Sequence, residues 1–378
     1  MAEWKECTIS EIGTVVGGAT PSTKKSENYE KGDIAWITPK DLSNFHGRYI
    51  ERGERNITEI GLKSCSAQLL PPNTILFSSR APIGYVAIAK NKVCTNQGFK
   101  SVIPNKNIDP LFLFYLLKYN KDAIENMGSG TTFKEVSGNT MKNILVKIPV
   151  SISEQRKIAE ILGSLDDKIE ENERINNNLE QQVSTLYQAW FEDFILSNKV
   201  CPDSWKYVTL ADIAEVSSGK RPSIKSAIQT NENSVPLVGA ASVIGFTNEA
   251  NHTDKILVIG RVGTHGVVQR FNSPCWASDN TLVITSGYYE YTNQILKRID
   301  YHLINRGSTQ PLITQGDMNK VVVLMPDNIT LTKFEEIAGI IMNWYETNII
   351  ENSKLTMIRD LLLQKLISGE IDVSNINF

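Results

Sequence analysis

The chain has 378 residues and a mass of 42.2 kDa, which exceeds one ordinary domain and predicts two or three. Its 41% hydrophobic and 21% charged residues, with a mean hydropathy of -0.20, are typical of a folded protein in water. The longest apolar run, Leu111–Leu117, is far shorter than the roughly 20 residues that cross a bilayer. The acidic start, with Glu3 and Glu6, is unlike a signal peptide, so we expect a cytoplasmic protein that does not bind membranes.

The five cysteines show no C-x-x-C spacing, and with the four histidines they form no zinc-site pattern. The net charge of -3 is unevenly distributed. Residues 1–150 carry 19 Lys and Arg against 14 Asp and Glu, and residues 201–328 carry 11 of each. Residues 151–200 carry 5 against 10, and residues 329–378 carry 4 against 7. Basic or neutral segments therefore alternate with acidic ones, which permits nucleic acid to bind the former.

The chain repeats itself. Seven positions near the start recur 201 residues later, namely Trp4, Lys5, Ile9, Ile12, Val15, Gly18 and Pro21 as Trp205, Lys206, Leu210, Ile213, Val216, Gly219 and Pro222. ILFSSRAPIG from Ile75 parallels ILVIGRVGTHG from Ile256, and Asn96 corresponds to Asn280. The segment Gly130–Pro149 recurs with an offset of 177. Because the blocks keep their order, we infer a tandem duplication of about 180–200 residues.

In chain order, residues 1–150 alternate short β-branched runs with Gly, Pro and Asn. The expected strands are IAWIT, TILFSS, GYVAIA, KSVIP and ILVKIP, with one clear helix at Pro110–Tyr119. Residues 201–328 offer VPLVGA, ILVIG, GVVQRF, TLVITS and VVVLMP, with a helix at Tyr291–Arg298. Each segment therefore predicts a mixed α+β domain around a compact twisted sheet.

Residues 151–200 and 329–378 are different in kind. Each follows a proline and opens with a helix-capping pattern, Ser151–Glu154 or Thr332–Glu335. A 4,3 apolar spacing then predicts a coiled-coil seam in each helix. The first seam is Ile158, Leu162, Leu165, Ile169, Asn172, Asn176, Leu179, Val183, Leu186 and Trp190, and the second is Ile337, Ile341, Trp344, Asn348, Glu351, Leu355, Ile358 and Leu362. Helices over Glu154–Leu196 and Lys333–Ile367 would measure roughly 65 and 50 Å.

A long helix with one apolar seam needs a partner of similar length, and the other helix supplies one. The expected fold is α+β: two tandem related mixed α/β domains, separated by two long antiparallel coiled-coil helices and related by an approximate two-fold axis. Four polar residues, Asn172, Asn176, Asn348 and Glu351, interrupt the seams. Either they select the register or mark where the helices diverge, or they form a polar docking patch. We expect Tyr187, Trp190, Phe191, Trp344 and Tyr345 to pack against the second domain.

The succession LPPNTILFSSRAPIGYVAIA, TNQGF and GSGTTFKEVSGNTMKNILVKIPVSISEQRKIAEIL resembles the first half of a type I restriction-modification specificity subunit. The second half resembles it through LADIAEVSSGKRP, ILVIGRVGTHG and NRGSTQPLITQGDMNKVVVLMP, although KFEEIAGII replaces the E-Q helix opening. The resemblance implies two target-recognition domains that each read half of a split double-stranded DNA site. It also implies that the helices set the spacing and dock two methyltransferase (modification) subunits.

The resemblance implies no catalysis and no cofactor in this chain. S-adenosylmethionine would belong to the methyltransferase subunits, and ATP and Mg to the partner subunits of the full complex, which adds restriction subunits. The sequence agrees: Pro71-Pro72 is followed by Asn73 instead of completing an [ND]-P-P-[FY] tetrad, and Gly219-Lys220 lacks the rest of a P-loop. The alternatives are a coiled-coil scaffold or adaptor whose two domains bind proteins, and a methyltransferase fragment, which the missing tetrad disfavours.

Candidate DNA contacts are cations and amides in loops, because phosphates attract cations while Arg, Lys, Asn and Gln read base edges. Each candidate has a structural alternative. For Arg80 and Arg261, which follow equivalent strands, it is an ion pair with a nearby carboxylate. For the small-residue loops Gly128–Lys134 and Gly307–Gln310 it is a structural turn, and for the other residues it is a solvated charge. The candidates are Lys24, Lys25, Arg80, Thr131, Thr132, Lys134, Arg221, Arg261, His265, Arg270, Thr309 and Gln310.

Overall fold

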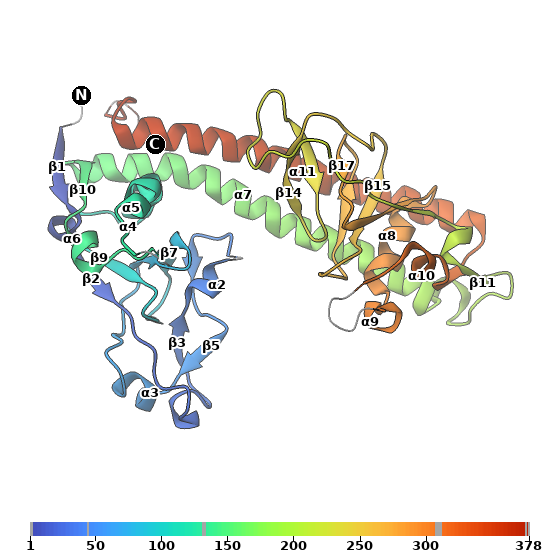
Figure 1. Cartoon of the computed structure of the whole chain (residues 1–378), viewed down its shortest axis with the longest axis horizontal. Coiled ribbons are helices and arrows are strands. Elements are labelled where there is room, and N and C mark those ends of the chain that lie inside the picture. Colours follow the sequence, from blue (N-terminus) through green and yellow to red (C-terminus); the bar gives the residue numbers. More distant parts are fainter. Residues whose placement is uncertain (1–2, 44, 131–133, 307–311, 375, 377–378) are drawn as a thin grey trace. The chain divides into compact units, whose positions relative to one another are not determined.

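The computed structural model describes residues 3–43, 45–130, 134–306, 312–374 and 376. The candidates Thr131, Thr132, Thr309 and Gln310 lie outside the described residues. The chain forms two compact units: unit 1 comprises Met1–Arg174 and Ile349–Phe378, and unit 2 comprises Ile175–Asn348. Each unit therefore contains one recognition-domain segment and a part of each long helix, α7 (Ile152–Tyr187) and α11 (Asn328–Ser368), drawn in green and in red tones in Figure 1.

Unit 1 is built on a five-stranded sheet of order β2-β9-β6-β7-β4, a three-stranded sheet of order β5-β3-β8 and a β1-β10 pair. Its strands are β1 (Trp4–Thr8), β2 (Gly13–Gly17), β3 (Ile34–Ile37), β4 (Tyr49–Ile50), β5 (Arg55–Ile57), β6 (Ile75–Ser79), β7 (Ile83–Ala89), β8 (Cys94–Thr95), β9 (Lys100–Pro104) and β10 (Leu145–Pro149). Its short helices are α1 (Ile9–Ile12), η1 (Ser26–Asn28), α2 (Pro39–Ser43), α3 (Glu59–Lys63), α4 (Pro110–Tyr119), α5 (Lys121–Asn126) and α6 (Gly138–Lys142).

Unit 2 has the same plan: a four-stranded sheet of order β12-β18-β15-β16, a three-stranded sheet of order β14-β13-β17 and a β11-β19 pair. Its strands are β11 (Lys206–Thr209), β12 (Glu215–Ser218), β13 (Val235–Val238), β14 (Val243–Thr247), β15 (Ile256–Gly260), β16 (Val268–Phe271), β17 (Trp276–Ala277), β18 (Thr281–Thr285) and β19 (Val322–Met325). The short helices among these strands are η4 (Leu210–Asp212), α8 (Tyr289–Arg298), α9 (Tyr301–Ile304) and α10 (Gln315–Asn319).

The two units share strand directions as well as strand order. In both three-stranded sheets the central strand pairs antiparallel on one side and parallel on the other, as β3 does with β5 and β8 and β13 does with β14 and β17. This agreement confirms the duplication and the mixed α/β class of the repeated domains. All ten predicted strands are present, and the predicted helix at Pro110–Tyr119 is α4.

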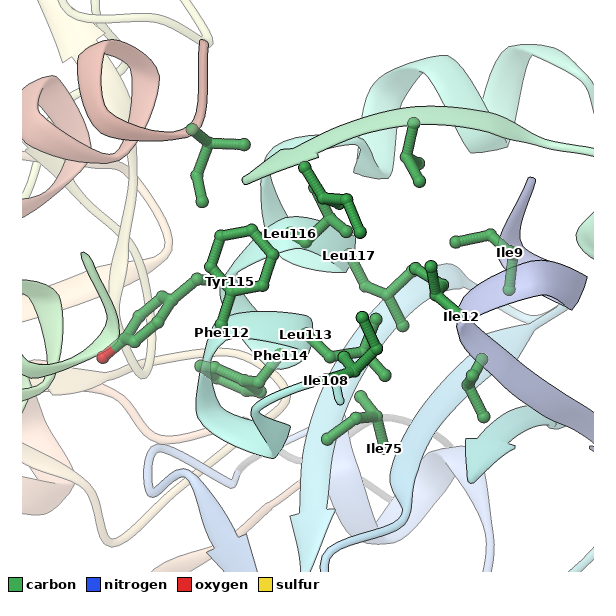
Figure 2. Packing of buried hydrophobic residues seen from close by; sticks show 14 of the residues in the cluster. Ile9, Ile12, Ile75, Ile108, Phe112, Leu113, Phe114, Tyr115, Leu116 and Leu117 are labelled. Carbon is green, nitrogen blue, oxygen red and sulfur yellow. The ribbon is translucent and has the colours of Figure 1, made fainter. Parts of the chain in front are cut away.

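The core of unit 1 surrounds α4. Six consecutive residues of this helix, 112–117, are buried, because it lies between strands β6 and β7 on one side and the long helices on the other. Leu113, Ile75 and Ile9 fill the sheet side of the cluster, whereas Tyr115 extends its hydroxyl away from them (Figure 2). That hydroxyl donates to Asp166 of α7 at 2.6 Å. The helix therefore joins the sheet to α7.

In each unit, one long helix also binds the start of a buried short helix, α4 in unit 1 and α8 in unit 2. In unit 1, the Gln155 side chain of α7 is 1% exposed and accepts a hydrogen bond from the Asp109 amide before α4 at 3.0 Å. In unit 2, Glu335 of α11 accepts from the amides of Glu290 and Tyr291 at 3.1 and 2.7 Å. Burial raises the pKa of Glu335, and these two amides oppose that shift. Glu335 in KFEEIAGII thus supplies a hydrogen-bond acceptor in the second repeat, as Gln155 of the E-Q opening does in the first.

The seam predicted for α7 is confirmed, because all ten of its positions are buried or half-buried. The helix ends earlier than predicted, at Tyr187, and continues as the π-helical turn η2 (Gln188–Glu192) and the short helix η3 (Ile195–Ser197). Tyr187, Trp190 and Phe191 pack in the core of unit 2, as predicted, with Phe191 5.7 Å from the ring of Trp205.

The seam predicted for α11 is wrong at three of its eight positions. The helix packs Phe334, Ala338, Met342 and Tyr345 in unit 2, whereas Trp344 is 67% exposed. The other misplaced positions are Ile337 and Ile358, which are exposed beside the packed Ala338 and the hydrogen-bonded Arg359, whereas Glu351 does face α7. Trp344 therefore does not pack as predicted, while Tyr345 does. The helix also begins five residues earlier than predicted, at Asn328, where Asp327 accepts a hydrogen bond from the Thr330 amide at 2.9 Å.

Asparagines pair the two helices inside each unit. In unit 1, Asn172 donates to Glu351 and Asn352 at 2.7 and 2.8 Å, and Arg359 reaches Asp166 at 2.7 Å. In unit 2, Asn348 donates to Asn176 at 2.9 Å, and Asn176 donates to the Tyr345 carbonyl at 3.2 Å. The segments run antiparallel, since later residues of α7 meet earlier residues of α11. Asn172 and Asn176 are 0% and 4% exposed, which favours register selection and excludes them from a docking patch.

Among the described residues, no helix has the length and hydropathy needed to cross a membrane.

Candidate nucleic-acid interface

One edge of the main sheet in each unit gathers loops from distant parts of the chain. In unit 1, the ends of β2 and β6 lie beside the start of β9, because Gly17 pairs with Lys100 and Ser78 bridges to Phe99. Backbone hydrogen bonds tie the loops together: Ala19 N to Thr95 O at 3.0 Å, Ser79 N to Gly98 O at 2.7 Å and Val136 N to Ser79 O at 3.0 Å. The loops that follow β2 and β6, the turn at Thr95–Phe99 and the segment Glu135–Val136 therefore form one surface, which we call loop cluster 1.

The corresponding segments of unit 2 form loop cluster 2. Its backbone bonds are Lys220 N to Ala277 O at 2.9 Å, Arg261 N to Asn280 O at 2.8 Å and Ile313 N to Arg261 O at 2.9 Å. Gly18 and Gly219, which occupy the same place in the repeat, permit the close approach of loops. A Cβ at Gly18 would lie 2.1 Å from the Asn96 carbonyl oxygen, and one at Gly219 would lie 2.0 Å from that of Ser278.

Loop cluster 1 contains several of the predicted residues. Arg80 follows β6 directly, as predicted, and is half-exposed beside Glu135 at 3.5 Å. The same carboxylate accepts from Lys100 at 3.3 Å, so Glu135 holds two cations at the sheet edge. Lys134 is exposed next to them. Both the predicted exposure at a loop and the alternative, a carboxylate partner, therefore apply to Arg80.

Lys24 and Lys25 are exposed in the loop after β2, where Lys25 lies 3.8 Å from Glu27. The sequence did not single out Gln97, which accepts a hydrogen bond from the Thr20 hydroxyl across two loops of the cluster. It follows Asn96, whose match with Asn280 was the available signal for this turn.

Loop cluster 2 contains an open cleft of about 510 Å³. Arg221, Lys225 and Asn280 are exposed in its wall, and the cleft is lined by Arg221, Pro222, Ser223, Lys225, Leu237, Ile244, Ser278, Asp279 and Asn280. Burial, and then the positive charge of Lys220, lowers the pKa of the nearby His252. The wall therefore presents cations and an amide, the groups that meet phosphates and base edges.

Arg261 and His265 lie within the turn after β15. The Arg261 Nε and the His265 Nε2 are buried and have no hydrogen-bond partner among the described residues, while His265 Nδ1 lies 3.1 Å from the Gly260 carbonyl oxygen. Both side chains are half-buried in this turn.

Arg270 is placed differently from the other candidates. Its side chain is 8% exposed and donates to both oxygens of Glu290, at 2.6 and 2.8 Å. It does not reach the surface of loop cluster 2, so we leave it out of the DNA-contact set. Within the described ranges no group of three or more His, Cys, Asp or Glu residues has a metal-binding arrangement.

Comparison with known proteins places these units in one family. A family model described as "Type I restriction modification DNA specificity domain" matches residues 1–181 and 202–359, once for each repeat. The MjaIX specificity subunit of a type I restriction enzyme of Methanocaldococcus jannaschii is 34% identical, covering 99% of this chain and 95% of the relative. The EcoR124I/EcoR124II specificity subunit of Escherichia coli is 35% identical over 43% of this chain and 41% of that one.

A solved structure shares the fold. The crystal structure of a type I restriction-modification S subunit from M. genitalium superposes with a TM-score of 0.59 at 19% sequence identity, covering 97% of this chain and 96% of the other. The resemblance drawn from the sequence motifs is therefore confirmed at the level of family and fold.

Proposed function

Since the chain belongs to the type I restriction-modification DNA specificity family, whose model matches both repeats, we propose that it reads a split double-stranded DNA site with one unit for each half. The observation that carries the proposal is the pair of loop clusters. The two units share strand order and the backbone bonds that join the loops, yet the side chains that line the loops differ. Two domains with the same backbone arrangement but different loop side chains suit two half-sites of different sequence.

The chemistry of the linings supports base reading in the major groove. Arginine and lysine recognise guanine, and asparagine and glutamine recognise adenine. Loop cluster 2 offers Arg221 and Asn280 in one cleft, and loop cluster 1 offers Arg80, Lys134 and Gln97. The exposed lysines would meet phosphates, which fixes position but carries no sequence information.

The long helix α11 supports the docking of modification subunits. Besides its packed seam it has exposed apolar side chains with helical spacing: Ile337, Ile340 and Trp344 in unit 2, and Ile350, Met357, Ile358 and Leu361 in unit 1. Apolar faces of this kind are typical of protein interfaces. We assign S-adenosylmethionine to the docked methyltransferase subunits and ATP and Mg to the partner subunits of the full complex; this chain itself acts without a cofactor.

DNA reading is tested by methylome mapping of cells that carry this chain with its modification subunit. We expect a split motif with a fixed gap. Arg221→Ala and Asn280→Ala should relax only one half of the motif, and Lys206→Ala, an exposed lysine on β11 outside the loops of cluster 2, should change neither half. Affinity of the complex for the site should fall steeply with salt. Binding to proteins but no motif would favour the adaptor alternative.

Docking is tested by the affinity of the modification subunit for variants of α11. Trp344→Glu places a charge at a 67% exposed apolar position, and we expect about tenfold weaker binding. Asn343→Glu places the same charge at an exposed polar position of the same helix and should leave binding unchanged. Equal effects of both variants, or none of either, would contradict docking through this face.

A further inference from the structure

In each unit a buried arginine of the recognition domain reaches a carboxylate on a long helix. In unit 1, the Arg48 side chain is 7% exposed and forms ion pairs with Asp167 and, at 3.0 Å, with Glu170 of α7. Its Nη1 also donates to the Gly163 carbonyl at 3.3 Å. A Cβ at Gly163 would lie 3.3 Å from this Nη1, so the glycine makes room for the guanidinium.

In unit 2, Arg270 makes the corresponding connection. Besides the two bonds to Glu290 within the domain, its Nη2 donates to Glu346 of α11 at 3.2 Å. Asn272 donates to the other oxygen of Glu346. Two side chains of the strand β16 region thus hold one carboxylate of the helix.

One receiving carboxylate in each unit, Asp167 or Glu346, occupies the same place in the repeat, whereas the arginines do not. Asp167 and Glu346 are 179 residues apart, the offset that also relates the buried Ala159 and Ala338. Arg270 lies on β16, the counterpart of β7, but Arg48 precedes β4, which pairs with β7 and has no counterpart in the described part of unit 2. A contact simply inherited through duplication would use matching strands. Instead two different domains reach the same helix position from different strands.

Buried ion pairs add little net stability, because removing both charges from water costs nearly as much as their attraction returns. What they supply is a defined geometry, since a bidentate guanidinium fits its carboxylates in one orientation. We propose that Arg48 and Arg270 are positioning residues that fix the orientation of each recognition domain on its helix, so that the gap between the half-sites is measured strictly. This inference rests on the proposed reading of a split site.

The test is a gap series of duplexes that carry both half-sites at the native gap and at one base pair more or less. One base pair shifts a half-site by about 3.4 Å and rotates it by about 34° around the duplex. The purified complex with its modification subunit is assayed by methylation rate. Glu346→Gln in unit 2, and Asp167→Asn with Glu170→Gln in unit 1, should each lower the ratio of native-gap to shifted-gap rates by about fivefold.

The controls separate positioning from stability. Glu336→Gln changes an exposed carboxylate of the same helix and should leave the ratio unchanged. Glu346→Asp keeps the charge and should restore the ratio. Glu346→Gln leaves Arg270 paired with Glu290, so unit 2 keeps a partner for the buried charge. The bases read in each half-site should stay the same in all variants.

The outcomes are decisive in both directions. An unchanged gap ratio in both the unit 1 and the unit 2 variants overturns the inference, and so does an equal fall in rate at every gap. If the wild-type complex itself shows no gap preference, the proposed split-site reading fails before positioning is reached.

Discussion

Truncating Phe334 tests which face of α11 is packed. This side chain is fully buried in unit 2, with ring centroids of Phe191, Tyr187 and Trp190 at 5.1, 6.1 and 6.1 Å. Removing a buried phenylalanine costs about 3–5 kcal/mol, and loss of several edge-on aromatic contacts places Phe334→Ala near the upper part of that range. Trp344, on the same helix, is 67% exposed, so Trp344→Ala should change stability by less than about 0.5 kcal/mol.

Hydrogen exchange of the full chain, followed in peptides that cover residues 331–345, measures the local opening free energy of this segment. A loss of about 4 kcal/mol corresponds to roughly thousandfold faster exchange in Phe334→Ala, whereas Trp344→Ala should stay within about threefold of wild type. If Trp344→Ala accelerated exchange as much as Phe334→Ala, the seam would contain Trp344 as the sequence spacing indicates, and the packing described for α11 would be wrong.

Three further outcomes are expected. Gly219→Ala should destabilise the protein by about 2 kcal/mol in thermal unfolding, because its Cβ would lie 2.0 Å from a neighbouring carbonyl oxygen. Asp327→Ala should lower the free energy of unfolding by about 1–2 kcal/mol at pH 7. Burial acts to raise the pKa of Asp327, but hydrogen bonds, including one from a backbone amide of α11, lower this pKa overall. The stabilisation by Asp327 is therefore present above about pH 4 and is lost as the pH falls further. Burial raises the pKa values of Cys94 and Cys275 to about 11, so at pH 8 both thiols should react with a disulfide reagent only after denaturant is added, and rapid reaction of either in the native chain would contradict their burial.

The sequence alone was sufficient for the features that depend on local pattern. Short β-branched runs bounded by Gly, Pro and Asn marked all ten predicted strands, because β-branched residues favour strands and the bounding residues favour turns. The duplication was visible because the matching blocks kept their order, and the seam of α7 was correct because its apolar residues lie on one face only.

Tertiary contacts decided what no local pattern contains. Helix α11 has two faces that could pack. The packed face includes Asn352 and Arg359, which look solvent-exposed in the sequence because they are polar. Only the structure shows that they bind Asn172 and Asp166 of α7. Arg270 reads in the sequence as a free cation, yet Glu290 and Glu346, 20 and 76 residues away, bury it. Burial and pairing depend on which segments meet, and that is fixed by the packing of elements far apart in the chain rather than by the spacing of residues within any one of them.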